Sequence, residues 1–198
     1  MYIAPNFTDE DWNNLDLDNN EDDWQKAIDA FYERLNSRYV EPVDKLIVLE
    51  KDVSPKNKRY GFTCLAIDML LIETVQAFKE GLKDSAGQSK ALFNRFLAES
   101  ERFSRYFTCE DERIALYKEF RCGILHQAEV QGSALVWSVG DLYDRISMPN
   151  TLNRSFFHQE LKNDLNDYIG SLRVAQSTEI RKAFRAKMDF IVARATSE

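Results

Sequence analysis

One stretch of the sequence constrains the fold more than any other, because it is apolar on nearly all sides. It covers residues 60–80 and reads YGFTCLAIDMLLIETVQAFKE. A helix that is hydrophobic all round has no face to offer to solvent, so it belongs in the centre of a core. Gly81 follows directly and favours the end of a helix at this point. The sequence therefore predicts a buried central helix.

Most of the remaining chain also has the period of helices. Apolar residues recur at helical spacing in segments near 22–39, 59–80, 88–106, 110–127, 154–171 and 177–194. Pro42 is expected to interrupt the first helix, with a second helical piece after it. The period changes after Gly132, where ALVWSV and LYDRISM flank Gly140 and Asp141. This pattern favours a short β-hairpin near 134–148. We expect a mainly α fold, a helical bundle with a small β-hairpin insertion.

The net charge of −7 is distributed unevenly along the 198 residues. Residues 1–30 contain nine acids and one base, Lys26, a net of −8, so the rest of the chain stands at +1. The body of the protein is thus neither strongly basic nor strongly repelling toward nucleic acid. We expect residues 1–21 to be an acidic, loosely ordered segment and residues 22–198 to form one domain. DLDNNEDDW lacks the glycine and glutamate of a calcium loop, with Glu21 and Ala27 in their places.

The three cysteines are Cys64, Cys109 and Cys122, and no C-x-x-C occurs. Neither a disulfide framework nor a zinc site is expected from this pattern. We predict no metal and no cofactor. No membrane span or secretory signal is apparent in the sequence, so a cytoplasmic protein without a membrane partner is the expectation.

FRCGILHQAE, residues 120–129, contains one of the two histidines, His126, and an arginine five positions before it. On an α-helical wheel Arg121 falls inside an apolar arc, where its charge has to meet a carboxylate, carbonyls, an anion or an interface. His126 lies about 140° away on a straight helix. The two converge only if the helix bends or ends near Gly123, or if the arginine side chain wraps around. Together they would suit phosphoryl transfer without a metal, because histidine moves protons and arginine stabilises phosphate charge.

Five other side chains are weaker candidates, and each has a structural alternative. Glu73 and Asp68 would neutralise Arg121 or another buried base. Glu129 would either orient His126 or face solvent. His158 is expected to be a packing or surface residue, and Cys122 an ordinary thiol rather than a nucleophile.

RCGILH resembles the R-x4-H motif of the HEPN superfamily. RYGFTCLAIDMLLIETVQAFKEG, LYKEFRCGILHQAEV and the later ALVW resemble a HEPN family found on plasmids and in prokaryotic defence loci. The similarity follows the element order from about 24 to 195 and is specific in those two helices. It implies a helical, metal-independent endoribonuclease, active as a toxin or phage-defence effector, that dimerises to form one composite cleft. It also implies that Arg121 binds the substrate phosphate, that His126 is the acid–base group, and that an antitoxin or regulatory protein is a possible partner.

The resemblance departs from the family pattern at Cys122, where active members commonly have asparagine. Two alternatives therefore remain open. One is a catalytically silent HEPN module that binds RNA, a nucleotide or a protein. The other is a purely structural bundle in which Arg121 lies in an internal ion pair.

Overall fold

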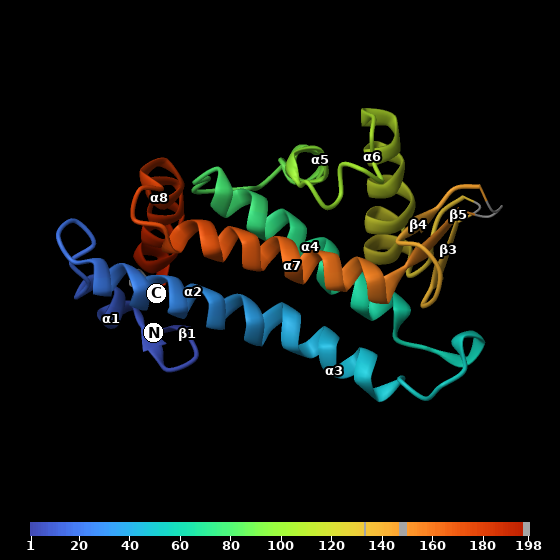
Figure 1. The fold of residues 1–198 in the computed structure, drawn as a ribbon, viewed down its shortest axis with the longest axis horizontal. Helices are drawn as coiled ribbons and strands as arrows, with labels where there is room; N and C mark the ends of the chain where they lie inside the picture. Colours follow the sequence, from blue (N-terminus) through green and yellow to red (C-terminus); the bar gives the residue numbers. More distant parts are fainter. Residues whose placement is uncertain (133, 147–149, 196–198) are drawn as a thin grey trace.

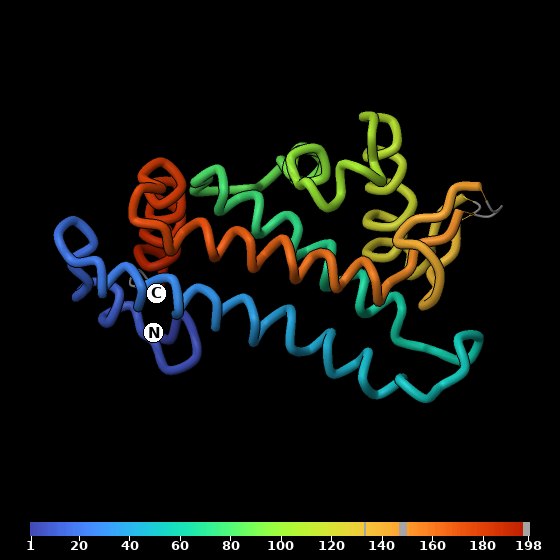
Figure 2. The backbone as a smooth tube through the Cα atoms, viewed as in Figure 1, coloured from blue at the N-terminus to red at the C-terminus, as the bar shows by residue number. Residues whose placement is uncertain are grey.

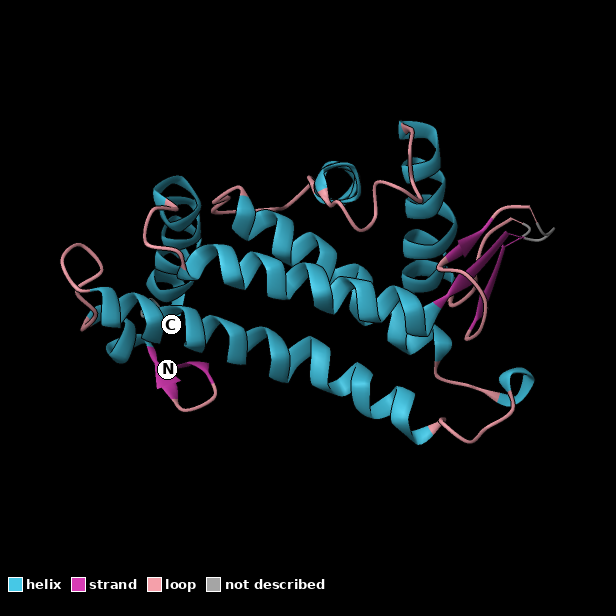
Figure 3. Cartoon of the chain, viewed as in Figure 1, coloured by secondary structure: helices cyan, strands magenta, loops and turns pink. Residues whose placement is uncertain are grey.

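Long helices that run side by side form the centre of the molecule (Figure 1). They are α4 (Gly61–Lys79), α7 (Arg154–Arg173) and the continuous helical segment that contains α2 (Glu21–Leu35) and α3 (Glu41–Leu49). The computed structural model describes residues 1–132, 134–146 and 150–195. Its mainly α-helical fold with a small β insertion confirms the predicted fold class (Figure 3).

The predicted central helix is α4. Leu65, Met69, Ile72 and Val75 are all fully buried there. The helix packs against α3, α7, α5 (Ser89–Glu99) and α8 (Thr178–Ala195). By length and composition α4 could also cross a membrane, with 56% of its most apolar window buried, but the core helix of a soluble protein passes the same test.

The sequence predicted an interruption of the first helix at Pro42, but the helical segment continues through this residue. α2 (Glu21–Leu35) continues through a π-helical turn, η1 (Asn36–Val40), into α3 (Glu41–Leu49). The tube in Figure 2 shows this as one continuous rod. Just before Pro42, the N–H of Glu41 donates to the carbonyl of Asn36, five residues back. Pro42 lies in the first turn of α3, where a missing N–H is tolerated.

Shorter helices cross the central ones. The predicted helix at 88–106 ends early, because Ser100 leaves helical geometry and its hydroxyl donates to Asp164 Oδ1 at 2.6 Å. The predicted helix at 110–127 is present but changes its geometry halfway. The elements are η2 (Pro55–Asn57), α5 (Ser89–Glu99), α6 (Glu110–Leu116), the π-helix η3 (Tyr117–Gln127) and α8 (Thr178–Ala195).

The β insertion is a three-stranded sheet at one end of the molecule, not the simple hairpin that the sequence predicted. β5 (Asn150–Asn153) lies between β3 (Ala134–Trp137) and β4 (Tyr143–Asp144). It pairs parallel to β3 and antiparallel to β4. The chain does turn at Gly140, with φ +86. The carbonyl of Gly140 accepts a hydrogen bond from Nδ2 of Asn153, the last residue of β5, at 2.7 Å. Residues 147–148 of the predicted hairpin lie outside the described residues.

The acidic N-terminal segment is packed against the body, whereas the sequence suggested loose order. It forms β1 (Tyr2–Ala4), β2 (Phe7–Thr8) and α1 (Asp9–Asn13). Ile3 and Trp12 are buried, and Trp12 Nε1 donates to Asp189 Oδ1 of α8 at 2.9 Å. Two of the segment's acids pair with bases of α8, Asp18 with Arg185 and Glu21 with Arg181, both at 2.6 Å. The prediction of loose order was based on the number of acids. It did not take account of the few apolar residues that anchor the segment or of basic partners far along the sequence.

The contact of Glu21 with Arg181 predicts a pH dependence of stability. Arg181 donates to both oxygens of Glu21, at 2.6 and 2.7 Å, and these hydrogen bonds lower the Glu21 pKa from 4.5 to about 2. Because the folded-state pKa is the lower one, the stabilisation is present above about 4.5 and is lost as pH falls toward about 2. We expect Glu21→Gln to make the thermal midpoint less steeply dependent on pH in this range.

The measurement is a set of thermal unfolding curves at several acidic pH values, with Glu10→Gln as the matched control. Glu10 is an exposed acid of α1, so its replacement removes the same charge without removing an Arg181 contact. Identical pH profiles for wild type and Glu21→Gln would contradict the prediction.

Candidate functional site

The helix that carries Arg121 and His126 changes from α to π geometry within the motif region. α6 ends at Leu116, and η3 continues from Tyr117 to Gln127. In a π-helix each hydrogen bond joins residues five apart, so residue i+5 lies above residue i. Arg121 and His126 therefore point to the same side, although α-helical geometry had separated them. The convergence comes from the helix type.

Arg121 is anchored on α4 by Glu73, one of the two acids that the sequence offered as its partner. Arg121 Nε donates to Glu73 Oε1 at 2.8 Å, and Nη2 reaches Oε2 at 3.4 Å. The side chains are 14% and 16% exposed, so the pair lies at the edge of the core. Burial opposes the charge of Arg121, but the hydrogen bonds and charge of Glu73 outweigh it, and the pKa of Arg121 is raised. The guanidinium also lies 5.4 Å from the centroid of the Tyr117 ring.

His126 is exposed and touches the outer side of the guanidinium. Its Nε2 lies 3.4 Å from Arg121 Nη1. A guanidinium can only donate hydrogen bonds, so in this contact Nε2 serves as the acceptor. Of the five N–H groups of Arg121, three are directed to Glu73 and His126, which leaves two for another oxygen ligand. The site thus combines an exposed imidazole, whose Nε2 accepts from Arg121, with a fixed guanidinium.

Gly123 allows the following chain to return closely against η3. A Cβ atom at this position would lie 2.6 Å from the carbonyl oxygen of Glu129 and 3.1 Å from the backbone nitrogen of Gln131. Both neighbours are backbone atoms, which have little freedom to move. Close packing therefore accounts for this glycine.

The other candidates from the sequence lie apart from the pair. The side chain of Cys122 is half-buried and that of Glu129 is exposed, and within the described residues no hydrogen bond joins either of them to His126. Asp68 does not serve Arg121. Its Oδ1 lies 2.7 Å from Nδ1 of His158, and both residues are buried. His158 is thus a packing residue, as expected.

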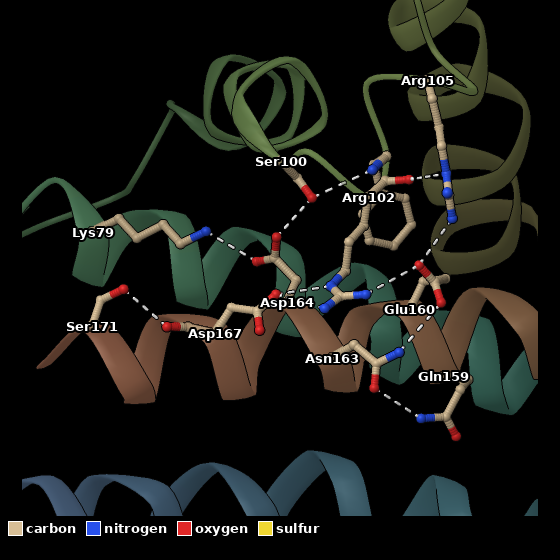
Figure 4. Close-up of polar contacts among 11 residues, drawn as sticks. Lys79, Ser100, Arg102, Arg105, Gln159, Glu160, Asn163, Asp164, Asp167 and Ser171 are labelled. Atoms are coloured by element: carbon tan, nitrogen blue, oxygen red, sulfur yellow. Dashed lines mark hydrogen bonds and ion pairs between the residues drawn. The ribbon is translucent and has the colours of Figure 1, made fainter. Parts of the chain in front are cut away.

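A larger polar cluster between α4, α7 and the turn after α5 was not foreseen (Figure 4). It surrounds a hollow of about 800 Å³. Its cations and acids neutralise one another: Lys79 with Asp164 at 3.0 Å, Arg102 with Asp167 at 2.8 Å, and Arg105 with Glu160 at 3.2 Å. Glu160, Asp164 and Asp167 recur at helical spacing, and this was the signal in the sequence. Because the charges are satisfied internally, the cluster holds elements together without calling for a ligand.

No protein-family model matches the chain, and the comparisons with curated proteins and with solved structures return no match. Among the described residues, no group of three or more His, Cys, Asp or Glu side chains is placed to hold a metal ion.

Proposed function

We propose that this protein is a HEPN-type endoribonuclease that cleaves RNA without a metal. The observation that carries the proposal is the contact of His126 with Arg121, which the π-helix brings about and Glu73 holds in place. The imidazole of His126 is exposed, so its Nε2 lone pair can exchange the Arg121 N–H for a substrate hydroxyl and take the proton of that hydroxyl. The N–H groups of the guanidinium that are not directed to Glu73 are suited to a phosphate. In a cell we assign it the role of a cytoplasmic toxin or phage-defence effector, held in check by an antitoxin or regulatory protein.

The reaction uses the ribose of the substrate as nucleophile. His126 Nε2 takes the proton of the 2′-hydroxyl, whose oxygen forms a bond to phosphorus while the bond from phosphorus to the 5′-oxygen breaks. Arg121 stabilises the charge that accumulates on the phosphate oxygens. The departing 5′-oxygen takes a proton from an acid, which we assign to the imidazolium of a second copy. The products are a 2′,3′-cyclic phosphate and a 5′-hydroxyl.

The composite site requires two copies, and an apolar stripe on α4 supports this part of the proposal. Phe62, Ala66 and Leu70 follow one another at four-residue spacing, and the next turn carries Glu73 of the candidate site. Phe62 and Leu70 are 39% and 40% exposed although α4 is the central helix of the core. A second copy placed on this stripe would lie beside Arg121.

Dimerisation gives a testable expectation. Wild type is expected to be a dimer at micromolar concentration in light scattering, and Phe62→Glu a monomer, because a charge on the stripe would have to be desolvated in the interface. Val48→Glu is the matched control, since Val48 is 68% exposed and belongs to a different helix, α3. A monomeric wild type would count against the composite site.

The second candidate function is a silent binding module, and the bidentate contact of Glu73 favours it. The carboxylate neutralises much of the charge that Arg121 would offer to a phosphate. Incubation of purified wild type with mixed RNA in EDTA, followed by identification of the product ends, separates the two candidates. Cyclic phosphate and 5′-hydroxyl ends support the nuclease. Intact RNA that is nevertheless bound supports the module.

A further inference from the structure

A second hollow, of about 460 Å³, lies between α2, η1, α4 and α8, and five of the residues that line it are cations. Arg34 and Arg38 enter it from α2 and η1, Lys83 from the loop after α4, and Lys187 and Arg194 from α8. Only two carboxylates line it, Glu73 and Asp84. We refer to this hollow as the basic pocket. It stands out in a chain whose net charge is −7.

The cations of the basic pocket have no ion-pair partners among the described residues. Nine of the fourteen arginines form ion pairs with carboxylates. Three of the five arginines that do not are Arg34, Arg38 and Arg194. Lys83 and Lys187 also lack such a pair. The polar cluster of Figure 4 is the opposite case, because its arginines and lysine are matched by acids.

The positions of these cations are set by neutral groups. Arg34 Nη1 and Arg38 Nη2 both donate to the carbonyl of Ile3, the latter at 3.3 Å. Lys187 donates to the carbonyl of Lys83 at 3.1 Å. A carbonyl orients a cation but leaves its charge in place. Burial and the neighbouring Arg38 accordingly lower the pKa of Arg34 to about 10, and burial lowers that of Lys187, with Arg194 and Arg34 adding to the effect against Asp84. A bound anion would relieve this repulsion.

Phe190 adds an aromatic surface to the basic pocket. Its ring centroid lies 5.8 Å from Lys187 Nζ and 5.9 Å from Arg194 Cζ. The residues at 187, 190 and 194 share one face of α8 by their spacing. Proteins that bind single-stranded nucleic acid combine cations, which contact the phosphate backbone, with aromatic rings, on which the bases stack.

The basic pocket and the candidate active site share one residue. Glu73 forms part of the wall of the pocket and at the same time holds Arg121. We propose that the basic pocket binds the phosphodiester backbone of single-stranded RNA and leads the strand to Arg121 and His126, an inference that rests on the proposed ribonuclease function for its choice of RNA.

The test measures binding of a short fluorescent 2′-O-methyl RNA, which carries phosphates but cannot be cleaved by 2′-hydroxyl attack. In Arg38→Gln/Lys187→Gln/Arg194→Gln three phosphate contacts are removed. We expect binding near 0.1 M salt to weaken on the order of 10- to 100-fold, and the slope of log affinity against log salt to fall by about 2, at about 0.7 per contact.

The matched control is Lys51→Gln/Lys56→Gln/Arg59→Gln. These exposed cations lie in η2 and on either side of it, at the opposite end of the molecule from α8 (Figure 1), and their replacement changes the net charge equally. Affinity within about twofold of wild type is expected. A second variant, Arg38→Lys/Lys187→Arg/Arg194→Lys, keeps all three charges and is expected to bind, so it tests the pocket even if the glutamine variant does not fold.

Equal loss of binding in the two glutamine variants, or no loss in the pocket variant, would overturn the basic pocket as a binding site. Absence of binding by wild type at low salt would do the same. The basic pocket and the proposed nuclease function can be refuted independently of each other. Binding that depends on the pocket, in a protein that leaves ordinary RNA intact, would uphold the pocket and refute the nuclease. Cleavage with binding unaffected by the pocket variant would give the reverse result.

Discussion

RNA cleavage by the His126→Ala variant is expected to be slower than wild-type cleavage on the order of 10²- to 10⁴-fold, the usual effect of removing a positioned acid–base group. His126 is exposed and its only described polar contact is with Arg121, so the fold should survive the change. The measurement is the single-turnover rate on labelled RNA with EDTA present. In a host cell, expression of wild type should arrest growth, whereas the variant should not.

Arg121 is expected to contribute through charge, with a loss on the order of 10²- to 10³-fold when it is replaced. Arg121→Ala alone leaves Glu73 partly buried without its partner, so a lost activity could reflect a disturbed fold. Arg121→Gln/Glu73→Gln removes both charges together and is the better variant. Its thermal midpoint should stay near that of wild type while cleavage is lost.

Gln127→Ala is the matched control for both variants, because Gln127 is the exposed neighbour of His126 at the end of η3. It should cleave RNA at the wild-type rate. Unchanged cleavage by His126→Ala would refute the mechanism. A wild type without activity would favour the binding module and make Cys122, where active HEPN nucleases commonly have asparagine, the first position to change.

The Glu50→Leu variant is expected to lose about 3–5 kcal/mol in free energy of unfolding, the usual cost of leaving one member of a buried ion pair alone. Arg154 is 1% exposed and its Nη2 pairs with Glu50 Oε2. Glu50 Oε1 also accepts the backbone N–H groups of Arg59 and Tyr60, the latter at 3.3 Å. The pair thus joins the end of α3, the start of α4 and the start of α7.

Urea unfolding measures this loss, and a double variant separates charge from packing. In Glu50→Leu/Arg154→Met no charge remains buried, so most of the lost stability should return. Burial opposes the charge of Glu50, but the backbone N–H of Arg59 and then Arg154 outweigh it and lower its pKa. The contribution of Glu50 is therefore present at neutral pH and lost as pH falls through its lowered folded-state pKa. Equal stability of the single variant and wild type would show that the pair contributes nothing.

Much of the fold could be predicted because its signals are local. The all-round apolar character of residues 60–80 requires a buried helix wherever that helix lies, and α4 is found in the core. Helical periodicity located α7 and α8 to within a few residues. The requirement that a guanidinium in an apolar arc find a partner was also a local deduction, and Glu73 meets it.

What the sequence by itself determined was the type of each long helix and the kind of partner that its charged residues need. Only the tertiary structure decided which partner is used. Asp68 contacts His158, whereas Glu73 forms the ion pair with Arg121. In the sheet, β5 lies between the two strands that were expected to pair as a hairpin. The π geometry of η3 and the gathering of cations from α2, η1 and α8 are likewise decided by packing. Periodicity describes which face of an element is apolar, but the choice of partner depends on which elements meet in space, and no single segment contains that information.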